Sequence, residues 1–456
     1  MKRLLLITYY WPPSGGSGVQ RWLKMAKYLP QNGWEVVVYT PSNPDANSTD
    51  SSLVKEIPPS IEVIKRKIKE PYSIYKKLVG KKSNEHIQAN LVGTSSAKRG
   101  FMQRLSLHIR ANWFIPDPRC WWIKPSVRFL SKLIKERGED YFNAIISTGP
   151  PHSMHLIARQ LHKEFNIPWV ADFRDPWTKI FYFKHLGLSK TAMQKHLQLE
   201  GEVLQSSNKI VVVSEGMRRE FTTGEYAAFA PKVEVITNGY DTADFSTKTN
   251  PILQEFEDKV NKIAADKFVI VHTGLLAEDG NPDSLWKTLG KMAKEESNFA
   301  ASVMIVTMGQ TAAVAQKQIE ENGLAQNHIE LGYVAHSESI AWQKRANLLL
   351  LPLRKEKEAG NILTGKFFEY LASGNPILAF GPQDGDLAKI LKETGSGTIC
   401  EWGDEKAIEE VISESDGAVL SGVKKSSCGS TEKYTRAFAA KQYAALLSEI
   451  THSPSL

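Results

Sequence analysis

The sequence predicts an α/β protein built from two doubly wound parallel sheets in two domains. Apolar runs typical of buried strands alternate with amphipathic helical segments along the chain. A polar and charged stretch, residues 240–267, interrupts this alternation near the middle and shows no strand pattern. The chain has 456 residues, which is more than a single core normally holds, so the alternation is assigned to two domains.

Strands in the first half are predicted where apolar runs end at glycine, proline or polar residues. Continuous runs of this kind are typical of strands buried on both faces of a parallel sheet. The predicted strands cover residues 3–10, 35–41, 143–149, 167–173, 208–214 and 233–239. Apolar residues at helical spacing predict helices over 19–29 and 152–165. Strands and helices in alternation indicate a sheet with helices on both faces.

The alternation resumes after residue 267 and predicts a second parallel sheet. Its strands are expected at 268–274, 301–309, 329–334, 347–353, 375–381 and 395–400. A last amphipathic helix, residues 434–450, has no strand after it. The predicted parts are a first domain over 1–245, a linker over 246–266, a second domain over 267–430 and a C-terminal segment over 431–456. Ligands in such folds bind outside the carboxyl ends of the strands, so the site is expected in a cleft between the sheets.

Composition favours a soluble globular protein. Apolar residues make up 42% of the chain and charged residues 23%, which is an ordinary balance for that class. The three cysteines, Cys120, Cys400 and Cys428, are far apart and lack metal-ligand spacing, so reduced thiols in a cytoplasmic protein are expected. The apolar run 4–7 is too short for a signal peptide, and no run approaches the ~18 apolar residues of a membrane-spanning helix.

Positive charge gathers in one segment of the first domain. Residues 65–137 contain 18 Lys and Arg but only 4 Asp and Glu, whereas the net charge of the whole chain is +7. The segment also contains Tyr72, Tyr75, Phe101, Trp113, Phe114, Trp121 and Trp122. Basic residues with aromatic rings suit an anionic membrane surface. The alternatives are a solvated, partly helical insertion with aromatic residues in the core, and a nucleic-acid surface, for which no recognition motif is present.

The stretch from Gly360 to Lys366 almost matches the phosphate-binding pattern GxxxxGK followed by Ser or Thr. The next residue, Phe367, has no hydroxyl group for a magnesium ion, and the stretch follows a late strand of its domain rather than an early one. We therefore reject a triphosphate-hydrolysing enzyme.

The same stretch predicts a helix that begins at Gly365 and stops at Gly374 in the left-handed conformation. The free N–H groups of its first turn and the charge of Lys366 suit a diphosphate. Glu369, one turn on, can accept hydrogen bonds from ribose hydroxyls. Thr364, just before the helix, is included in this predicted donor-binding set. The alternative is a solvated ion pair between Lys366 and Glu369, which are three residues apart.

Gly15 and Gly16 follow the first strand and precede a helix. Gly16 and Gly18 suggest a dinucleotide fingerprint, but that pattern needs a third glycine where Arg21 stands, so we reject a nicotinamide enzyme. Gly15 and Gly16 would let the backbone approach a donor phosphate closely. The alternative is a tight turn that only starts the helix.

Histidines and charged residues follow two successive strands, so both loops are expected at the same edge of the sheet. His152 and His155 could transfer a proton or contact an acceptor; alternatively they are surface or helix-capping residues. Arg174 stays protonated and could clamp a phosphate, held in place by Asp172 or Asp175. The alternative is a structural Arg–Asp pair. The predicted catalytic residues are Arg174, Asp172 and His152.

No cofactor and no metal are expected. Residues 384–386 read DGD, which is similar to the DxD of metal-dependent transferases. They precede a predicted helix, however, where an aspartate caps the N-terminus.

Three segments together resemble the GT-B glycosyltransferases of family 4. They are the strand, glycine loop and helix of residues 4–29, the segment VEVITNGYD at 233–241 and the segment GKFFEYLASGNPILAF at 365–380. The family's inter-domain Asn-Gly-x-Asp is matched by Asn238, Gly239 and Asp241. The order of elements fits over nearly the whole chain. The resemblance implies two Rossmann-like domains facing across a cleft, with the last helix crossing back to the first domain.

The family's site residues transfer to this chain with two departures. The second glutamate of its E-x7-E pattern, which binds donor ribose, matches Glu369. The first falls on Asn361, which carries no charge but can still hydrogen-bond a sugar, so Asn361 stays in the predicted donor-binding set. The loop at 272–283 lacks the Arg and Lys that often follow the first strand of the second domain. The resemblance therefore assigns the diphosphate charge mainly to Lys366 and the helix start. Many relatives have a histidine where Arg174 stands.

The resemblance implies a retaining, metal-independent, hexosyltransferase-like enzyme. It would move a sugar from a nucleotide-diphosphate sugar to a glycan or lipid-linked acceptor in cell-surface polysaccharide synthesis. The basic segment 65–137 adds the expectation of a cytoplasmic protein that binds peripherally to the inner face of the membrane. The alternative is a nucleotide-sugar-binding protein of GT-B fold without turnover, which Asn361 and the missing basic pair keep open.

Overall fold

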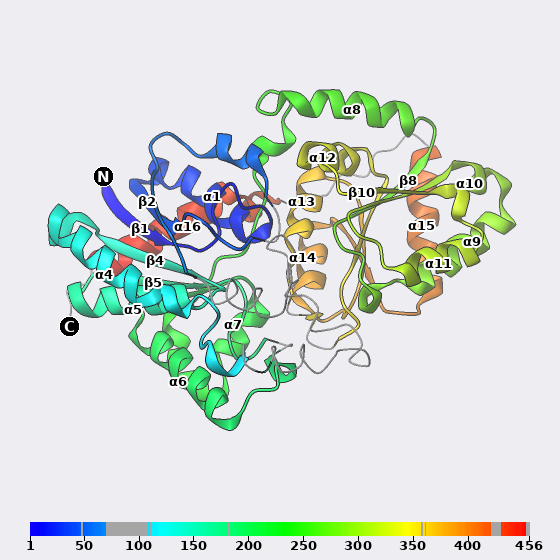
Figure 1. Cartoon of the computed structure of the whole chain (residues 1–456). Helices are drawn as coiled ribbons and strands as arrows, with labels where there is room; N and C mark the ends of the chain where they lie inside the picture. Colours follow the sequence, from blue (N-terminus) through cyan, green and yellow to red (C-terminus); the bar gives the residue numbers. More distant parts are fainter. Residues whose placement is uncertain are drawn as a thin grey trace, which may run out of the picture. The chain divides into compact units, whose positions relative to one another are not determined.

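The computed structural model describes residues 1–46, 49–69, 108, 111–180, 183–356, 359–360, 362–420 and 430–452. The chain divides into two compact units. Unit 1 consists of Met1–Thr237 with Arg436–Leu456, and unit 2 consists of Asn238–Thr435. Each unit contains one parallel sheet with helices on both faces (Figure 1). The predicted fold class, with two doubly wound α/β sheets, is confirmed.

Unit 1 contains a seven-stranded sheet in the order β3-β2-β1-β4-β5-β6-β7. The strands are β1 (Lys2–Ile7), β2 (Trp34–Pro41), β3 (Glu62–Arg66), β4 (Ala144–Gly149), β5 (Trp169–Phe173), β6 (Lys209–Val212) and β7 (Val233–Val235). The helices are α1 (Ser17–Tyr28), α4 (Cys120–Arg137), α5 (Ser153–Phe165), α6 (Lys190–Ser206), α7 (Glu215–Thr222) and α16 (Arg436–His452). The central strand β1 pairs with both β2 and β4, so Leu5 lies between Val37 and Ile145.

Both faces of this sheet are buried, which explains the continuous apolar runs. In β1, Leu4 and Leu6 pack in the core formed with α1 and α16. Leu5 and Ile7 point the opposite way, into the core formed with α4 and α5. A strand covered on both faces gains from an apolar side chain at every position.

Unit 2 contains a six-stranded sheet in the order β10-β9-β8-β11-β12-β13. The strands are β8 (Phe268–Thr273), β9 (Val303–Met308), β10 (His328–Gly332), β11 (Leu348–Pro352), β12 (Ile377–Phe380) and β13 (Gly397–Cys400). The helices are α8 (Pro251–Ile263), α9 (Asp283–Glu295), α10 (Ser297–Ser302), α11 (Ala313–Glu321), α12 (His336–Arg345), α13 (Gly365–Ser373), α14 (Asp386–Thr394) and α15 (Glu405–Leu420).

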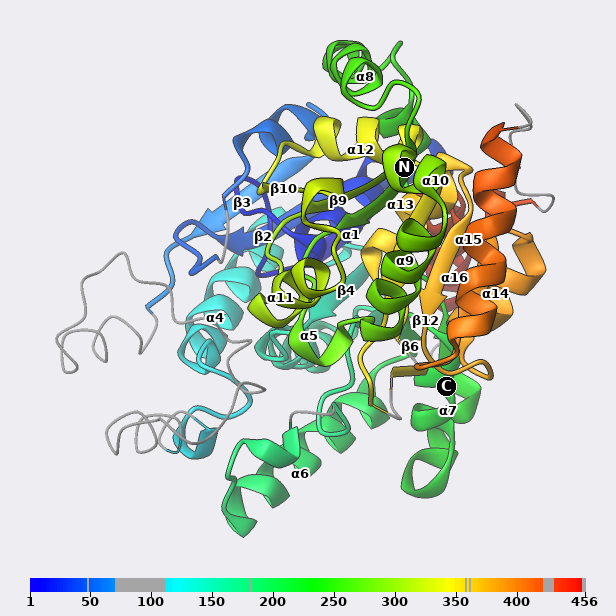
Figure 2. The same ribbon diagram turned by 90° about the vertical axis from the view of Figure 1, so that its right-hand side faces the viewer.

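The helices of unit 2 also form two layers. Residues of α12, α13 and α14 share one core with Val269 and Val271 of β8. Residues of α9, α11 and α15 share the other core with Phe268 and Ile270. Figure 2 shows α9 beside α15. As in unit 1, the alternating side chains of a strand supply both cores.

The structure differs from the predicted linker at 246–266. Helix α8 occupies most of that stretch and packs against α12 in unit 2. Leu253 and Val260, which are seven residues apart on one helical stripe, are fully buried. The remaining positions are polar, so the stretch resembles a linker in composition although it is a one-sided helix. The division between the units falls at Thr237, earlier than the predicted residue 245.

The basic segment 65–137 is partly built into unit 1. Its first residues belong to β3, and its last part is α4, which leads to β4 and packs against α5 (Figure 1). Trp122 of α4 is buried and stacks on Tyr39, with ring centroids 4.9 Å apart. Trp113 and Trp121 are exposed, with 79% and 48% of their surface accessible. Tyr72, Tyr75 and Phe101 lie outside the described residues.

The last helix returns to unit 1. Helix α16 packs against α1, and Tyr443 and Leu447 are fully buried in the core that they share. The predicted crossing of the C-terminal helix back to the first domain is therefore confirmed.

Candidate functional site

The strand order fixes where loops gather in each unit. Both sheets have the order 3-2-1-4-5-6 when their strands are counted within the unit, and unit 1 has a seventh strand at the edge. In that order the direction of winding reverses between β1 and β4 and between β8 and β11. Ligands of doubly wound folds bind outside the carboxyl ends of the strands at such a point. The predicted residues of unit 1 follow β1 and β4 or lie at the end of β5, and those of unit 2 follow β11.

In unit 2, helix α13 begins and ends as predicted. Thr364 is its N-cap residue, Gly365 is its first residue, and Gly374 stops it in the left-handed conformation with φ +73°. The Thr364 side chain does not cap the helix, and its buried Oγ1 has no hydrogen-bond partner among the described residues. The start of α13 thus keeps N–H groups that its own N-cap side chain leaves unbound.

Helix α13 is tied to the strands on both sides of the reversal point. The Thr273 N–H at the end of β8 donates to the Tyr370 hydroxyl (2.9 Å), and that hydroxyl donates to the carbonyl of Leu350 in β11 (3.4 Å). Phe367 and Phe368 are completely buried in the same core. The first turn of α13 is therefore held at a defined place relative to both strands.

Lys366 lies over the loop that follows β8. A Cβ atom added to Gly274 would be 3.2 Å from Lys366 Nζ, and Gly274 has φ +89°, so two features favour glycine there. Burial lowers the pKa of Lys366 to about 8, and the charge of Glu369 opposes that shift. The nearby His272 is neutral, because burial and then the charge of Lys366 lower its pKa to about 3. Among the described residues, no carboxylate lies within ion-pair distance of Lys366.

Glu369 is held by helix α12 instead of by Lys366. Its Oε1 is 3.3 Å from His336 Nε2, and its Oε2 accepts a hydrogen bond from Gln343 Nε2 (3.1 Å). About a third of the Glu369 side chain, 32%, remains accessible. A carboxylate can accept several hydrogen bonds on its two oxygens. The alternative ion pair between Lys366 and Glu369 is not formed, and Asn361 lies outside the described residues.

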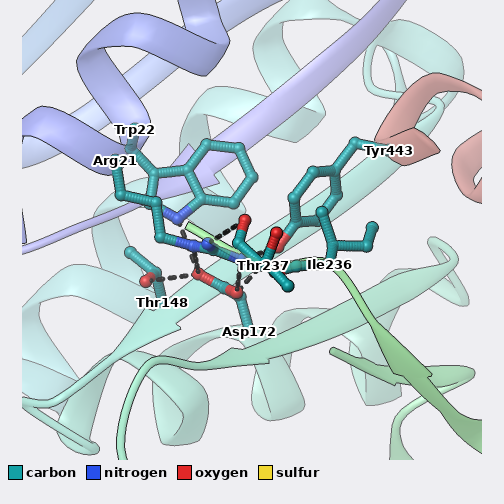
Figure 3. Close-up of polar contacts among 7 residues, drawn as sticks. All are labelled: Arg21, Trp22, Thr148, Asp172, Ile236, Thr237 and Tyr443. Carbon is teal, nitrogen blue, oxygen red and sulfur yellow. Dashed lines mark hydrogen bonds and ion pairs between the residues drawn. The ribbon is translucent and has the colours of Figure 1, made fainter. Parts of the chain in front are cut away.

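In unit 1, Asp172 lies at the centre of a buried polar network (Figure 3). Its Oδ1 accepts hydrogen bonds from Arg21 Nη2 (3.0 Å) and from the Tyr443 hydroxyl (2.7 Å). Its Oδ2 accepts from Trp22 Nε1 (2.7 Å) and from Thr148 Oγ1 (2.7 Å). Arg21 Nε donates to the same oxygen (3.3 Å). Asp172 is 0% exposed, so no oxygen is left for a substrate.

The predicted catalytic role of Asp172 is corrected by this burial. The structural Arg–Asp pair that was the alternative does exist, but its arginine is Arg21 and not Arg174. Burial alone would raise the pKa of Asp172, but the Arg21 charge and the hydrogen bonds from its neighbours outweigh burial and hold the pKa below its usual range. Arg21 also donates to the carbonyls of Ile236 (2.9 Å) and Thr237 (3.1 Å), where the chain leaves unit 1.

Arg174 lies partly buried just after β5, without the predicted aspartate clamp. Its N–H donates to the Gly149 carbonyl (2.9 Å), and its Nη2 donates to the Pro150 carbonyl. A Cβ atom on Gly18 would lie 2.5 Å from Arg174 Nη1, and the guanidinium is 5.8 Å from the Tyr10 ring centroid. Within the described parts of the chain, Arg174 forms no ion pair. It is thus a cation available to an anion at this edge of the sheet.

The two predicted histidines are neutral and mostly enclosed. His152 is the N-cap residue of α5, makes no capping bond, and stacks on Trp177 with ring centroids 4.6 Å apart. Burial, followed by the charges of His155 and Arg174, holds the pKa of His152 well below its ordinary value. His155 Nδ1 is 2.8 Å from Ser147 Oγ, and burial lowers the His155 pKa to about 3. Neither residue is the surface or capping histidine of the alternative interpretation.

Gly15 and Gly16 form the turn before α1. Gly16 has φ +93° and its carbonyl accepts from the Val19 N–H (3.1 Å), so this glycine starts the helix. That observation supports the turn interpretation and does not test a donor contact.

Asp386, from the DGD segment, is the first residue of α14, and Gly385 is the N-cap residue. A carboxylate in the first turn is favourable beside the positive helix end.

Several residues around these sites had no separate signal in the sequence. Arg21 stands where a dinucleotide fingerprint would have a glycine, and Trp22 is an apolar residue within the predicted helix 19–29. His336 and Gln343 lie on α12, more than 25 positions before Glu369. Only the packing of α12 against α13 brings them to its carboxylate.

Residues 254–415 match the family described as glycosyl transferases group 1. The matched segment includes α13, with Lys366 and Glu369, and most of unit 2. The predicted resemblance is therefore confirmed over this part of the chain. No sequence among the curated proteins matches the chain.

Solved structures are similar over the whole length of the chain. A glycosyltransferase from Rickettsia africae has a TM-score of 0.60 at 14% identity, covering 99% of each chain. Anabaena Alr3699/HepE in complex with UDP has a TM-score of 0.54 at 14% identity, covering 99% of this chain and 97% of its own. WaaG, described as a glycosyltransferase involved in lipopolysaccharide biosynthesis, has a TM-score of 0.52 at 13% identity, covering 98% of each chain. The two units therefore have the GT-B fold.

Proposed function

We propose, from the match of unit 2 to the group 1 glycosyl transferases, that this protein moves a sugar from a nucleotide-diphosphate sugar to an acceptor. One observation carries the proposal. The Lys366 ammonium has no carboxylate partner among the described residues and lies over Gly274, at the reversal point of the sheet and beside the start of α13. A point charge and a helix start at that place suit a diphosphate.

The chemistry follows from where negative charge develops. The acceptor oxygen forms a bond to the anomeric carbon, and the electron pair of the sugar–phosphate bond passes to the leaving diphosphate. Lys366 and the N–H groups of α13 stabilise that charge, the kind of electrostatic effect that usually dominates catalysis. The acceptor proton passes to a leaving-group oxygen. Glu369, oriented by His336 and Gln343, accepts hydrogen bonds from the ribose hydroxyls of the donor.

The finer parts of the proposal concern the acceptor and the stereochemistry. Arg174 holds a phosphate of the acceptor or donor, and His152 contacts the acceptor as a neutral group. In unit 2, Thr364 contacts the donor, and in unit 1, Gly15 and Gly16 allow the backbone to approach a phosphate closely. The acceptor attacks the anomeric carbon from the same face as the one from which the leaving group departs, so the anomeric configuration is retained. Lys366 takes the place of a metal in neutralising the diphosphate. The UDP-glucose complex of HepE supports a nucleotide-sugar donor.

The proposed acceptor is a glycan or a lipid-linked sugar of a cell-surface polysaccharide, used at the cytoplasmic face of the membrane. The structural similarity to WaaG, which is involved in lipopolysaccharide biosynthesis, supports this class of acceptor. None of the helices in the described residues is both long enough and apolar enough to cross a membrane. Peripheral attachment to that face is part of the proposal.

The proposal is tested by measuring nucleoside diphosphate binding and nucleotide release from a panel of sugar donors. Lys366→Met is expected to lower turnover by about 10²- to 10³-fold, because a charge on the leaving group loses its partner. Glu369→Gln is expected to raise the donor KM with a smaller effect on kcat. Lys392→Met, which removes an exposed lysine from α14, serves as the matched control and is expected to match wild type.

Three outcomes separate the alternatives. Binding and turnover that both depend on Lys366 support a glycosyltransferase. Binding of the donor without release by wild type supports the nucleotide-sugar-binding protein. Absence of binding to any nucleoside diphosphate overturns the site. A product of opposite anomeric configuration to the donor, seen by NMR, would contradict retention, and loss of turnover in EDTA would contradict metal independence.

A further inference from the structure

Helix α4 of unit 1 carries a row of cations on its outer face. Lys124, Arg128, Lys132 and Lys135 are spaced by four, four and three residues, which places them on one side of a helix, and all four are exposed. The opposite side of α4 packs into the core through Trp122, Ile123, Ser126, Leu130 and Ile134. The row covers twelve residues, and the eleven steps between its first and last residue correspond to about 17 Å along the helix axis.

The same cations line a groove between α4 and α5. The groove has a volume of about 750 Å³. Two carboxylates in its wall are already paired, Glu136 with Lys132 (3.5 Å) and Glu164 with Lys135 (3.0 Å). Ser131 also donates to Glu164 (2.6 Å). The remaining two cations of the wall, Lys124 and Arg128, form no ion pair with any described residue, so they carry the positive charge of the groove.

Exposed indole rings lie at the N-terminal end of the row. Trp121 is 48% exposed and lies one turn before Lys124. Its ring packs edge-on against Phe114, with centroids 5.5 Å apart. Trp113, next to Phe114 in the chain, is 79% exposed. Two exposed indole rings beside a row of cations suit a partner with both apolar and anionic character.

We propose that this α4 face, made of Trp113, Trp121, Lys124, Arg128, Lys132 and Lys135, docks on a bilayer that contains anionic lipids. Lys124 and Arg128 bind lipid phosphates at the groove, and the two indole rings enter the headgroup region, where such rings are favoured. A small soluble phosphate would use the groove but not the exposed rings. This inference rests on the proposed function at a membrane surface, and it assigns the contact between protein and bilayer to one face of α4.

Vesicle binding by the full chain tests the assignment without any sugar transfer. Wild type is expected to bind vesicles of phosphatidylglycerol mixed with phosphatidylcholine, to bind pure phosphatidylcholine weakly, and to be released by salt. Lys124→Gln with Arg128→Gln is expected to weaken binding about 25-fold, since each cation near an anionic surface contributes about fivefold. Trp113→Ala with Trp121→Ala is expected to weaken binding by a similar factor at every salt concentration at which wild type still binds.

A matched control removes the same charge elsewhere. Lys317→Gln with Lys406→Gln takes two exposed lysines from α11 and α15 of unit 2 and is expected to bind as wild type does. Equal weakening in this control would show that only net charge matters and would overturn the assignment. Equal binding to pure phosphatidylcholine, displacement by millimolar glycerol phosphate, or preference for RNA over vesicles would also overturn it. Nucleotide release from a soluble donor is expected to be the same in all these variants, so failure here is distinct from failure of sugar transfer.

Discussion

The direction of a single side chain decides the role of Asp172. Along β5, Trp169, Ala171 and Phe173 point into the core shared with α5, whereas Val170 points to the core shared with α1 and α16. Side chains alternate across a sheet, so Asp172 points the same way as Val170. It therefore meets Arg21 and Tyr443 inside unit 1 rather than a ligand at the sheet edge. The sequence places a carboxylate near the end of a strand but does not state which helices cover that face.

Replacing Asp172 by Asn is expected to destabilise unit 1 by about 3–5 kcal/mol, because Arg21 would keep a buried charge without its partner. The measurement is the free energy of unfolding in urea at pH 7. Tyr443→Phe is the graded control, since it removes one hydrogen bond and is expected to cost about 1–2 kcal/mol. Equal effects of the two substitutions would contradict the importance of the ion pair.

The same carboxylate predicts a dependence of stability on pH. The pKa of Asp172 is lowered in the folded protein, so its stabilising effect is complete above the unfolded pKa of about 3.9 and is lost as the pH falls through the folded value. Between pH 7 and pH 3 the free energy of unfolding is therefore expected to fall more steeply for wild type than for Asp172→Asn. Parallel curves would contradict the assignment.

Lys366 and Glu369 could be selected from the sequence, but their partners could not. A glycine followed by a lysine and, one turn on, a glutamate is a local pattern on one helix. The distance from Lys366 to Gly274 and the bonds from His336 and Gln343 to Glu369 depend on how α13 packs against β8 and α12. The sequence therefore leaves an ion pair within α13 open, and the tertiary contacts decide against it.

At the scale of elements, a glycine that ends a helix predicts the bounds of an element better than the average polarity of a stretch does. Helix α13 begins at Gly365 and stops at Gly374 as predicted, because only glycine adopts φ +73° without strain. Strand β3 and several helices, α4 and α8 among them, have no counterpart among the elements predicted from the sequence. Their charged positions face outward, while a few apolar positions, such as Leu130 in α4 and Leu253 in α8, are fully buried. Average polarity conceals such one-sided patterns.

Two glycine substitutions are expected to change stability in opposite directions. Gly374→Ala is expected to destabilise unit 2 by about 1 kcal/mol, because an L-residue is strained in the left-handed conformation. Gly201→Ala, inside helix α6 with nothing within 4 Å of the added Cβ, is expected to stabilise unit 1 by up to about 1 kcal/mol. Thermal unfolding of both variants tests this prediction. A change of the melting temperature in the same direction for both variants would contradict it.

At the scale of the whole molecule, the chain ends in the unit where it begins. Helix α16 supplies Ala440, Tyr443 and Leu447 to a core of unit 1, although unit 2 precedes it in sequence. Close to the two crossings between units, the Arg21 network joins Tyr443 of α16 to the carbonyls of Ile236 and Thr237. The last helix is thus an integral part of the first unit's core.

Leu447→Ala is expected to destabilise unit 1 by about 2–5 kcal/mol, the usual cost of a large cavity in a core. Hydrogen exchange is expected to speed up in β1 and β4 and to stay unchanged in β8 and β11. Lys441→Ala, on the exposed side of the same helix, is the control and is expected to stay within about 0.5 kcal/mol of wild type. Faster exchange in unit 2 alone would contradict the assignment of α16.

The sequence by itself determined the two parallel sheets, a last helix with no strand after it, and the start of α13 with Lys366 and Glu369; the return of the last helix to unit 1 was implied only by the family resemblance. Those features depend on local periodicity, on glycine conformation and on the order of elements, all of which are written along the chain. Tertiary structure alone decided that Asp172 pairs with Arg21, that Glu369 is held by α12, and that α4 exposes a basic face with bare indole rings. Each of these depends on which face of an element is covered, and that is fixed only when residues distant in sequence pack together.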